Sequence, residues 1–196
     1  VNVLRYFRTF EHADIKKSYW IVPKQQIGIT HLKVAVELYN SGKLKIWPDD
    51  ENDELYIFKK LHIQKLSGND KNNSGLVLTV YLSQHLDQAV LLPGDANYNL
   101  IKKYRYRYYG LVATHHGASS HDCLLSMPKP FRDFNKIAFS FGEKDSYKHP
   151  KIDSFIEHDI NGWTNRFSTV NGHIHFGCYF YPPYNKAYIC KMGIIQ

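Results

Sequence analysis

Cysteine is scarce in this chain of 196 residues, which has only Cys123, Cys178 and Cys190. An odd number at wide spacing, without a C-x-x-C pair, indicates neither a disulfide framework nor a cysteine zinc site. The pattern favours a reducing compartment, so we expect a cytoplasmic protein. No apolar run approaches the roughly 20 residues that span a bilayer, and no secretory signal is evident, so we expect no membrane partner.

Acidic side chains are also in deficit, with 18 Asp and Glu against 25 Lys and Arg, and the formal net charge is +7. This balance suits a partner rich in phosphate, such as nucleic acid or an anionic lipid head group. Hydrophobic residues make up 43% of the chain and charged residues 22%, which is typical of a globular protein rather than a disordered one.

Hydrophobic periodicity predicts alternating strands and helices, and therefore an α/β fold without internal repeats. The expected helices cover 1–10, 30–39, 97–103 and 152–160, and the expected strands cover 18–22, 44–47, 61–66, 76–82, 89–92, 111–113, 137–140, 165–168, 173–181 and 187–190. Thr30 is the expected N-cap of the second helix. The expected buried face of this second helix consists of Leu32, Ala35, Val36 and Tyr39. The strand over 61–66 has the alternation of a half-buried strand, and Asn171-Gly172 predicts a hairpin turn.

Three short segments carry residues suited to chemistry, and each is expected in a loop at or near a strand end, where α/β folds place functional groups. They are Gly94-Asp95, His115-His116-Gly117 and His149-Pro150. A carboxylate and imidazoles gathered at one edge are ligands that zinc or manganese accepts. Each segment also has a plainer interpretation. The two adjacent histidines can hydrogen-bond backbone groups in a turn, and Asp95 can cap the helix expected over 97–103.

Taken together, these segments resemble a known family. The elements that carry the likeness follow one another in order: Asn72-Asn73-Ser74, Leu92-Pro93-Gly94-Asp95-Ala96, His115-His116-Gly117-Ala118-Ser119, Ser140-Phe141-Gly142, His149-Pro150 and Thr169-Val170-Asn171-Gly172-His173-Ile174. This series is similar to the C-terminal half of metallo-β-lactamase-fold hydrolases related to the ComEC DNA-uptake proteins. The resemblance implies half of an αβ/βα sandwich, with a mixed β-sheet flanked by helices, in a single partial domain over 1–196.

The same resemblance implies the site. Asp95 would be a metal ligand that bridges two divalent ions, and His115 or His116 would be another ligand. Asp95, His116 and His149 would form the catalytic group, with His149 as a ligand or a phosphate contact. The implied metal is zinc, with manganese as the alternative.

The family signature H-x-H-x-D-H is absent from this chain. The helix expected over 1–10 looks like the one that follows that signature. We therefore expect the remaining ligands on a preceding segment or a partner chain, because Asp95 and one or two histidines are too few for a metal pair. Without its other half, the sheet is expected to expose an apolar face.

A run of alternating cations and aromatics adds a candidate nucleic-acid contact. Lys102, Lys103, Arg105 and Arg107 alternate there with tyrosines, which suits single-stranded nucleic acid, although a solvated helix end has the same composition. His173 and His175 share a strand face, and an exposed face is the simpler interpretation.

The leading hypothesis is a metal-dependent phosphodiesterase, specifically a nuclease, that needs the missing N-terminal ligands. The alternatives are a metallo-hydrolase of a small phosphoester or other ester, and a catalytically inactive scaffold or subunit.

Overall fold

The structure, a computed structural model of the whole chain, describes residues 19–24, 28–47, 54–57, 61–82, 89–102, 107–118, 126–142, 146–171, 174 and 176. The helix expected over 1–10, Gly172 of the expected hairpin turn, the pair His173 and His175, and the strand expected over 187–190 lie outside these residues. Of the strand expected over 173–181, only residues 174 and 176 are described. Among the described residues, no helix combines the length and the apolar character needed to cross a membrane.

The chain divides into two compact units, Val1–Asp53 and Glu54–Gln196. In the first unit, strand β1 (Trp20–Pro23) pairs in parallel with β2 (Leu44–Trp47), and helix α3 (Ile29–Asn40) connects them. Gly42 follows the end of α3, with a positive φ of 67° that glycine adopts without steric cost. The single partial domain expected over 1–196 stays a prediction.

Two expectations for α3 are wrong. Its N-cap residue is Gly28, not Thr30. The expected buried face is largely exposed, with 49% of Leu32, 48% of Val36 and 65% of Tyr39 accessible, whereas Leu38 is buried at 4%. Periodicity identified an apolar stripe, but burial depends on what packs against the helix, and the helix buries a different residue, Leu38.

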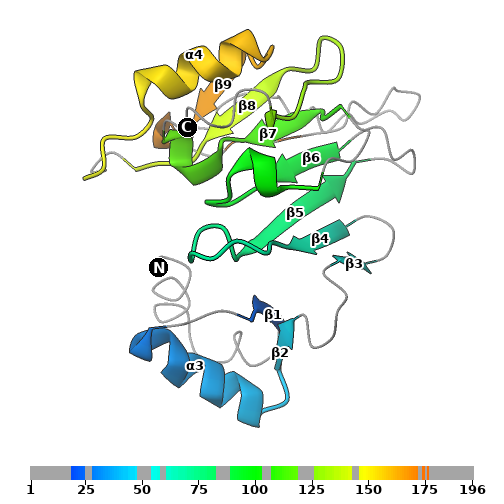
Figure 1. Cartoon of the computed structure of the whole chain (residues 1–196), viewed down its shortest axis with the longest axis vertical. Coiled ribbons are helices and arrows are strands. Elements are labelled where there is room, and N and C mark those ends of the chain that lie inside the picture. The colour runs from blue at the N-terminus through cyan, green and yellow to red at the C-terminus, as the bar shows by residue number, and fades with distance from the viewer. Residues whose placement is uncertain are drawn as a thin grey trace, which may run out of the picture. The chain divides into compact units, whose positions relative to one another are not determined.

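The second unit is built on a seven-stranded mixed sheet, which confirms the α/β class (Figure 1). Its strands lie in sequence order: β3 (Glu54–Ile57), β4 (Leu61–Lys65), β5 (Leu76–Tyr81), β6 (Ala89–Leu92), β7 (Gly110–Val112), β8 (Lys136–Phe139) and β9 (Asn165–Ser168). Pairing is antiparallel from β3 to β6 and parallel from β6 to β9. The parallel half therefore brings the carboxyl ends of β6, β7, β8 and β9 to one edge.

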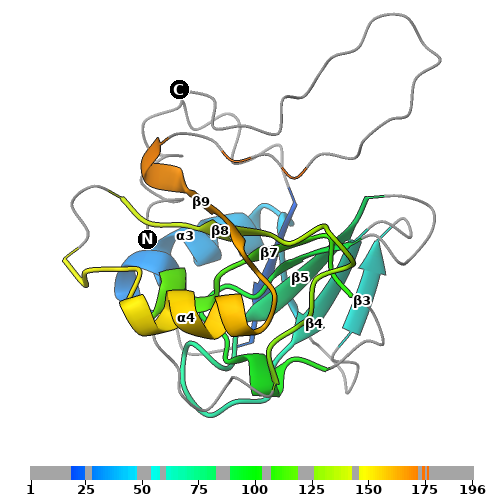
Figure 2. The same ribbon diagram turned by 90° about the horizontal axis from the view of Figure 1, so that it is seen from above.

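One face of this sheet is covered by helix α4 (Ile152–Ile160), which has the bounds expected from the sequence. Figures 1 and 2 show α4 beside β8 and β9. The rings of Phe139 and Phe155 meet edge to face, with their centroids 4.8 Å apart. Leu91, Leu111 and Ile137, each at most 1% exposed, supply the core from three adjacent strands. The opposite face carries an apolar groove, lined among others by Leu92, Val112 and Ala138.

Two local expectations in this unit are wrong. Residues 62–64 of β4 are all buried, rather than alternating, so both faces of the strand are covered at these positions. The helix expected over 97–103 shrinks to a 3-10 turn, η1 (Tyr98–Leu100). The backbone N–H of Lys102, which a helix would direct to the carbonyl of Tyr98, donates instead to Oε1 of Gln64 at 3.2 Å. Tertiary contacts thus replace the helical bond.

Candidate metal-binding edge of the sheet

The candidate residues gather where three parallel strands end. Gly94-Asp95 follows β6, the turn η2 (Thr114–Gly117) follows β7, and Ser140 follows β8. Because these strands are parallel neighbours, their carboxyl ends meet at the edge where α/β folds bind ligands. The expectation that Asp95 and the two histidines follow strand ends is confirmed.

The turn η2 has an unusual backbone. His115 and His116 have φ values of 48° and 59°, in the left-handed region that costs a non-glycine residue about 1–2 kcal/mol. Three backbone bonds hold the turn in place. The N–H of His115 donates to the carbonyl of Gly94 at 2.9 Å, the N–H of Ala118 to the carbonyl of His115 at 3.0 Å, and the N–H of Lys151 to the carbonyl of Gly117 at 2.9 Å. These bonds tie the turn to the loop that carries Asp95 and to the start of α4.

Gly117 is required by the same turn. Its φ is 87°, and a Cβ built on it would lie 2.6 Å from Cβ of Pro150 and 2.7 Å from Cδ1 of Phe139. Both distances are shorter than any tolerable contact, so this position lets the His116 turn pack directly against the segment that carries His149.

His116 and Asp95 form the closest functional pair. Nε2 of His116 lies 3.5 Å from Oδ1 of Asp95, and the two side chains are 47% and 42% exposed. Nδ1 of His116 lies 2.5 Å from the carbonyl oxygen of Ser140. A carbonyl only accepts, so Nδ1 carries the proton and donates, and Nε2 is directed at the carboxylate. Metal-binding histidines are commonly oriented in this way, by a bond from the other ring nitrogen.

The two other histidines lie next to this pair. The ring centroid of His149 is 6.1 Å from that of His115 and 6.1 Å from that of His116. The plane of the His149 ring is nearly parallel to the plane of the His116 ring and tilted against that of the His115 ring. The exposed ring of Tyr147 stacks on His149 at 5.9 Å. The structure therefore brings Asp95, His115, His116 and His149 together, and among the two adjacent histidines it directs His116 at the carboxylate.

These residues do not complete a metal site by themselves. Zinc in proteins takes four ligands, or three with an open position. In the part of the chain that the structure describes, no group of three or more His, Cys, Asp or Glu side chains is arranged to hold a metal ion. Asp95 and His116 fit as two ligands of a larger set.

A buried chain of hydrogen bonds through Tyr98 and His158 supports the turn η2. The backbone N–H of Thr114 donates to the hydroxyl of Tyr98 at 3.2 Å, and Nε2 of His158 lies 3.0 Å from the same oxygen. Nδ1 of His158 donates to the carbonyl of Ser154 at 2.6 Å, so Nε2 is the acceptor of the Tyr98 hydroxyl. Burial lowers the pKa of His158, and the bond to Ser154 opposes that shift. The neutral imidazole is therefore the form that this relay needs.

Sequence reasoning did not identify Tyr98 and His158 as supports of the turn. Both are polar aromatic side chains that are at most 2% exposed. The available signal was the position of His158 three residues after Phe155, on the same side of a helix whose bounds the sequence predicted.

The Asn72-Asn73-Ser74 element also supports the Asp95 loop. Oδ1 of Asn73 accepts the backbone N–H of Asn97 at 2.9 Å. Asn73 is itself held by Asp70, whose carboxylate accepts bonds from the side chain and backbone of Asn73, and these bonds hold the pKa of Asp70 below its usual value. The N-cap residue of η1 is Asn97, and its side chain makes no capping hydrogen bond. Asp95 is therefore not the cap that its position before the expected helix suggested.

The candidate nucleic-acid contacts are only partly described. Lys102 and Arg107 are exposed, whereas Lys103 and Arg105 lie outside the described residues. Arg107 precedes β7 and so lies toward the amino end of that strand, whereas Asp95 and His116 lie at the carboxyl edge. Arg107 is thus not part of the Asp95–His116 edge.

Comparisons of the chain with protein-family models, curated proteins and solved structures found no match. The likeness to metallo-β-lactamase-fold hydrolases stays a prediction, and the geometry of the edge carries the functional argument.

Proposed function

We propose that this chain is part of a metal-dependent hydrolase of phosphodiester bonds, with nucleic acid as its substrate. One observation carries the proposal: the ends of three parallel strands bring Asp95 and His116 within 3.5 Å, while the other imidazole nitrogen of His116 is bound to a backbone carbonyl. That arrangement presents one carboxylate oxygen and one imidazole nitrogen toward the same point, which is the pairing of hard and borderline ligands that zinc and manganese accept.

The roles of the residues follow from their geometry. Asp95 and His116 would hold a divalent ion, and the remaining ligands would come from residues outside the described ones or from another chain. A bound divalent ion supplies a water of lowered pKa and stabilises charge on a phosphoryl oxygen. Ser140 keeps the ring of His116 oriented through its carbonyl. His149, half-buried beside His116, is placed to contact a phosphate oxygen.

Charge supports nucleic acid over a small ester as the substrate. The net charge of +7 favours an anionic polymer, and Lys102 and Arg107 are exposed cations near the aromatic run. A small phosphoester would gain little from Arg107, which lies toward the opposite edge of the sheet, so it is the weaker alternative.

A non-catalytic role has its own supporting observation. Through Ser140 and Asp95, His116 bridges the loop after β6 and the end of β8, and a purely structural side chain could make the same two contacts. In that case Asp95 and His116 would only lock two loops of a scaffold.

Metal content separates these hypotheses. Plasma emission spectrometry on the full chain, after equilibration with zinc or manganese and desalting, should detect metal that is lost in Asp95→Asn and in His116→Ala. The exposed carboxylate of Asp153 offers a matched control, and Asp153→Asn should retain the metal. Metal binding that both site substitutions leave unchanged would contradict the proposal and favour the scaffold. No binding at all would mean that this chain by itself lacks the remaining ligands, which would then have to come from a preceding segment or a partner chain.

Substrate class is tested separately by following cleavage of a labelled single-stranded oligonucleotide and of a small chromogenic phosphodiester under the same metal conditions. Faster cleavage of the oligonucleotide, lost in Asp95→Asn and reduced in Arg107→Ala, supports the nuclease. Cleavage of the small ester alone, unchanged in Arg107→Ala, supports the small-ester alternative.

A further inference from the structure

The loop between β8 and α4 carries an exposed aromatic ring close to the Asp95–His116 pair. The rings of His116 and His149 are stacked, with centroids 6.1 Å apart and planes at 24°, and the rings of His149 and Tyr147 are stacked, with centroids 5.9 Å apart and planes at 15°. These separations are within the range of offset stacking between aromatic side chains. A series of three nearly parallel rings therefore runs from the carboxylate of Asp95 to Tyr147, which is 73% exposed.

The backbone of this loop is fixed to the turn that carries His116. Nζ of Lys151 donates to the carbonyl of Tyr147 at 2.9 Å, and the backbone N–H of Lys151 donates to the carbonyl of Gly117 at 2.9 Å. Both ends of the segment 147–151 are thereby held by hydrogen bonds. The exposed ring of Tyr147 is thus tied to the backbone of η2, and its position beside the site depends on defined contacts.

Lys148 adds a cation next to the exposed ring. Its side chain is exposed, and its φ of 57° lies in the left-handed region, which costs a non-glycine residue about 1–2 kcal/mol. Conformations of this kind persist where the surrounding contacts hold them, and they are frequent at ligand sites. A cation and an exposed ring in consecutive positions are the two groups that bind the phosphate and the base of a single-stranded nucleic acid.

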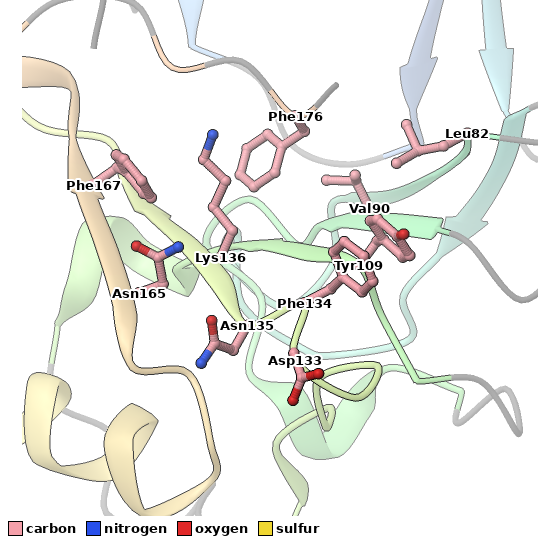
Figure 3. A pocket seen from close by; sticks show the side chains of 10 residues that line it. All are labelled: Leu82, Val90, Tyr109, Asp133, Phe134, Asn135, Lys136, Asn165, Phe167 and Phe176. Carbon is pink, nitrogen blue, oxygen red and sulfur yellow. The ribbon is translucent and has the colours of Figure 1, made fainter. Parts of the chain in front are cut away.

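The loop lies at the edge of the sheet opposite to a cavity of about 230 Å³ (Figure 3). Lys136 and Asn165, which line that cavity, are the first residues of β8 and β9, whereas the loop follows the carboxyl end of β8. Parallel strands have their amino ends at one edge and their carboxyl ends at the other, so the cavity is separated from the Asp95–His116 pair by the length of the strands. A substrate held at that pair would therefore meet the exposed groups of the loop, not the walls of the cavity.

We propose that this loop binds an unpaired base of a single-stranded nucleic acid, with the base stacked on the ring of Tyr147 and a flanking phosphate beside the ammonium of Lys148. The inference rests on the proposed function and names what the site recognises, a strand whose bases are accessible. In a duplex the neighbouring base pairs cover both faces of a base, so a protein ring can stack only on a base that is splayed out of the helix or lies at an end. Every base has such a face, so binding should depend on the presence of a base and not on the sequence.

Binding of a fluorescently labelled single-stranded DNA oligonucleotide to the full chain, measured by fluorescence anisotropy in EDTA, tests the proposal without cleavage. The comparison probes are a duplex of the same sequence and an abasic strand of the same length, which keeps the phosphates but has no bases. We expect the single strand to bind at least about fivefold more tightly than the abasic strand, which is the lower end of what one base stacked on a protein ring contributes.

Tyr147→Ala removes the ring and should weaken binding of the single strand at least about fivefold, while binding of the abasic strand and of the duplex stays unchanged. Tyr147→Phe keeps the ring and should bind all three probes as the unmodified chain does. Tyr39→Ala, which removes a ring that is 65% exposed on α3, is the matched control and should change nothing. A thermal melt of each variant verifies that it is folded.

Lys148→Met keeps the apolar stem of the side chain and removes the charge. Because it removes a phosphate contact and not a base contact, it should weaken binding of the single strand and of the abasic strand about equally, and it should lower the salt dependence of binding. Lys71→Met, at an exposed loop position, is the matched control and should change neither.

Three results would overturn the proposal: no binding of the single strand, equal binding of the single strand and the abasic strand by the unmodified chain, or unchanged binding of the single strand by the folded Tyr147→Ala variant. Asp95→Asn should bind the single strand in EDTA no more weakly than the unmodified chain, although it should lose metal. Base-dependent binding in a chain that binds no metal would count against the proposed hydrolase alone. Metal binding without base-dependent binding would count against this inference alone.

Discussion

Removal of the Tyr98 hydroxyl tests whether the buried relay holds the His115–His116 turn. Tyr98→Phe keeps the ring, which is 1% exposed, and removes one oxygen atom. That oxygen accepts the backbone N–H of Thr114 at 3.2 Å and donates to Nε2 of His158 at 3.0 Å. Both partners are buried, at 3% and 2% exposure, so water does not readily replace the lost group.

The expected cost follows from the two groups left without this partner. A buried donor or acceptor that loses its hydrogen bond costs about 1–3 kcal/mol, so the loss of both predicts a destabilisation of about 3 kcal/mol. For a chain of this size each kcal/mol lowers Tm by roughly 2–4 °C, which predicts a fall of roughly 6–12 °C. A thermal melt followed by circular dichroism measures this shift. Hydrogen exchange at the Thr114 amide should also become faster in the variant.

Tyr147→Phe is the matched control, because it removes the same atom from a side chain that is 73% exposed. Its Tm should stay within about 1–2 °C of the unmodified chain, as is usual for surface changes. The reasoning would be refuted if Tyr98→Phe changed Tm no more than Tyr147→Phe, or if the Thr114 amide kept its protection.

Three further results are expected. Gly117→Ala forces a Cβ to within 2.7 Å of Phe139 at a positive φ and should cost more than about 2 kcal/mol in chemical denaturation, whereas Gly142→Ala, with nothing within 4 Å, should be nearly neutral. Asn73→Ala removes the acceptor of a backbone N–H in the Asp95 loop and should lower the denaturant midpoint by the equivalent of about 1 kcal/mol, with an unchanged m-value. Burial lowers the pKa of His158 in the folded state, so the unfolded state binds more protons in the window below the unfolded value of about 6.5. Stability should therefore fall as pH drops below that value, and Tm measured between about pH 5 and 8 should vary less in His158→Gln. An equal pH dependence in that variant would assign the effect to other groups.

Local pattern alone determined much of the parallel half of the sheet. The strands at 89–92 and 165–168 and the helix at 152–160 have the bounds expected from the sequence. The placement of Asp95 and of the histidine pair after strands followed from the same pattern. Neighbouring parallel strands end at the same edge of a sheet, so the order of elements already predicted that Asp95 and the histidine pair lie close together.

Only the tertiary structure decided which side chains are covered and where each group points. Leu32 and Tyr39 share the apolar stripe of α3 but are exposed, because burial depends on what packs against the helix, not on its own periodicity. Two adjacent histidines are equivalent in the sequence, and the left-handed backbone of their turn directs His116 at Asp95. Lys136 lies just before the strand expected over 137–140, yet it is 6% exposed, and its ammonium lies near the rings of Phe167 and Phe176. A sequence records local preference, whereas contacts between segments far apart in the chain set burial, orientation and the environment of a charge.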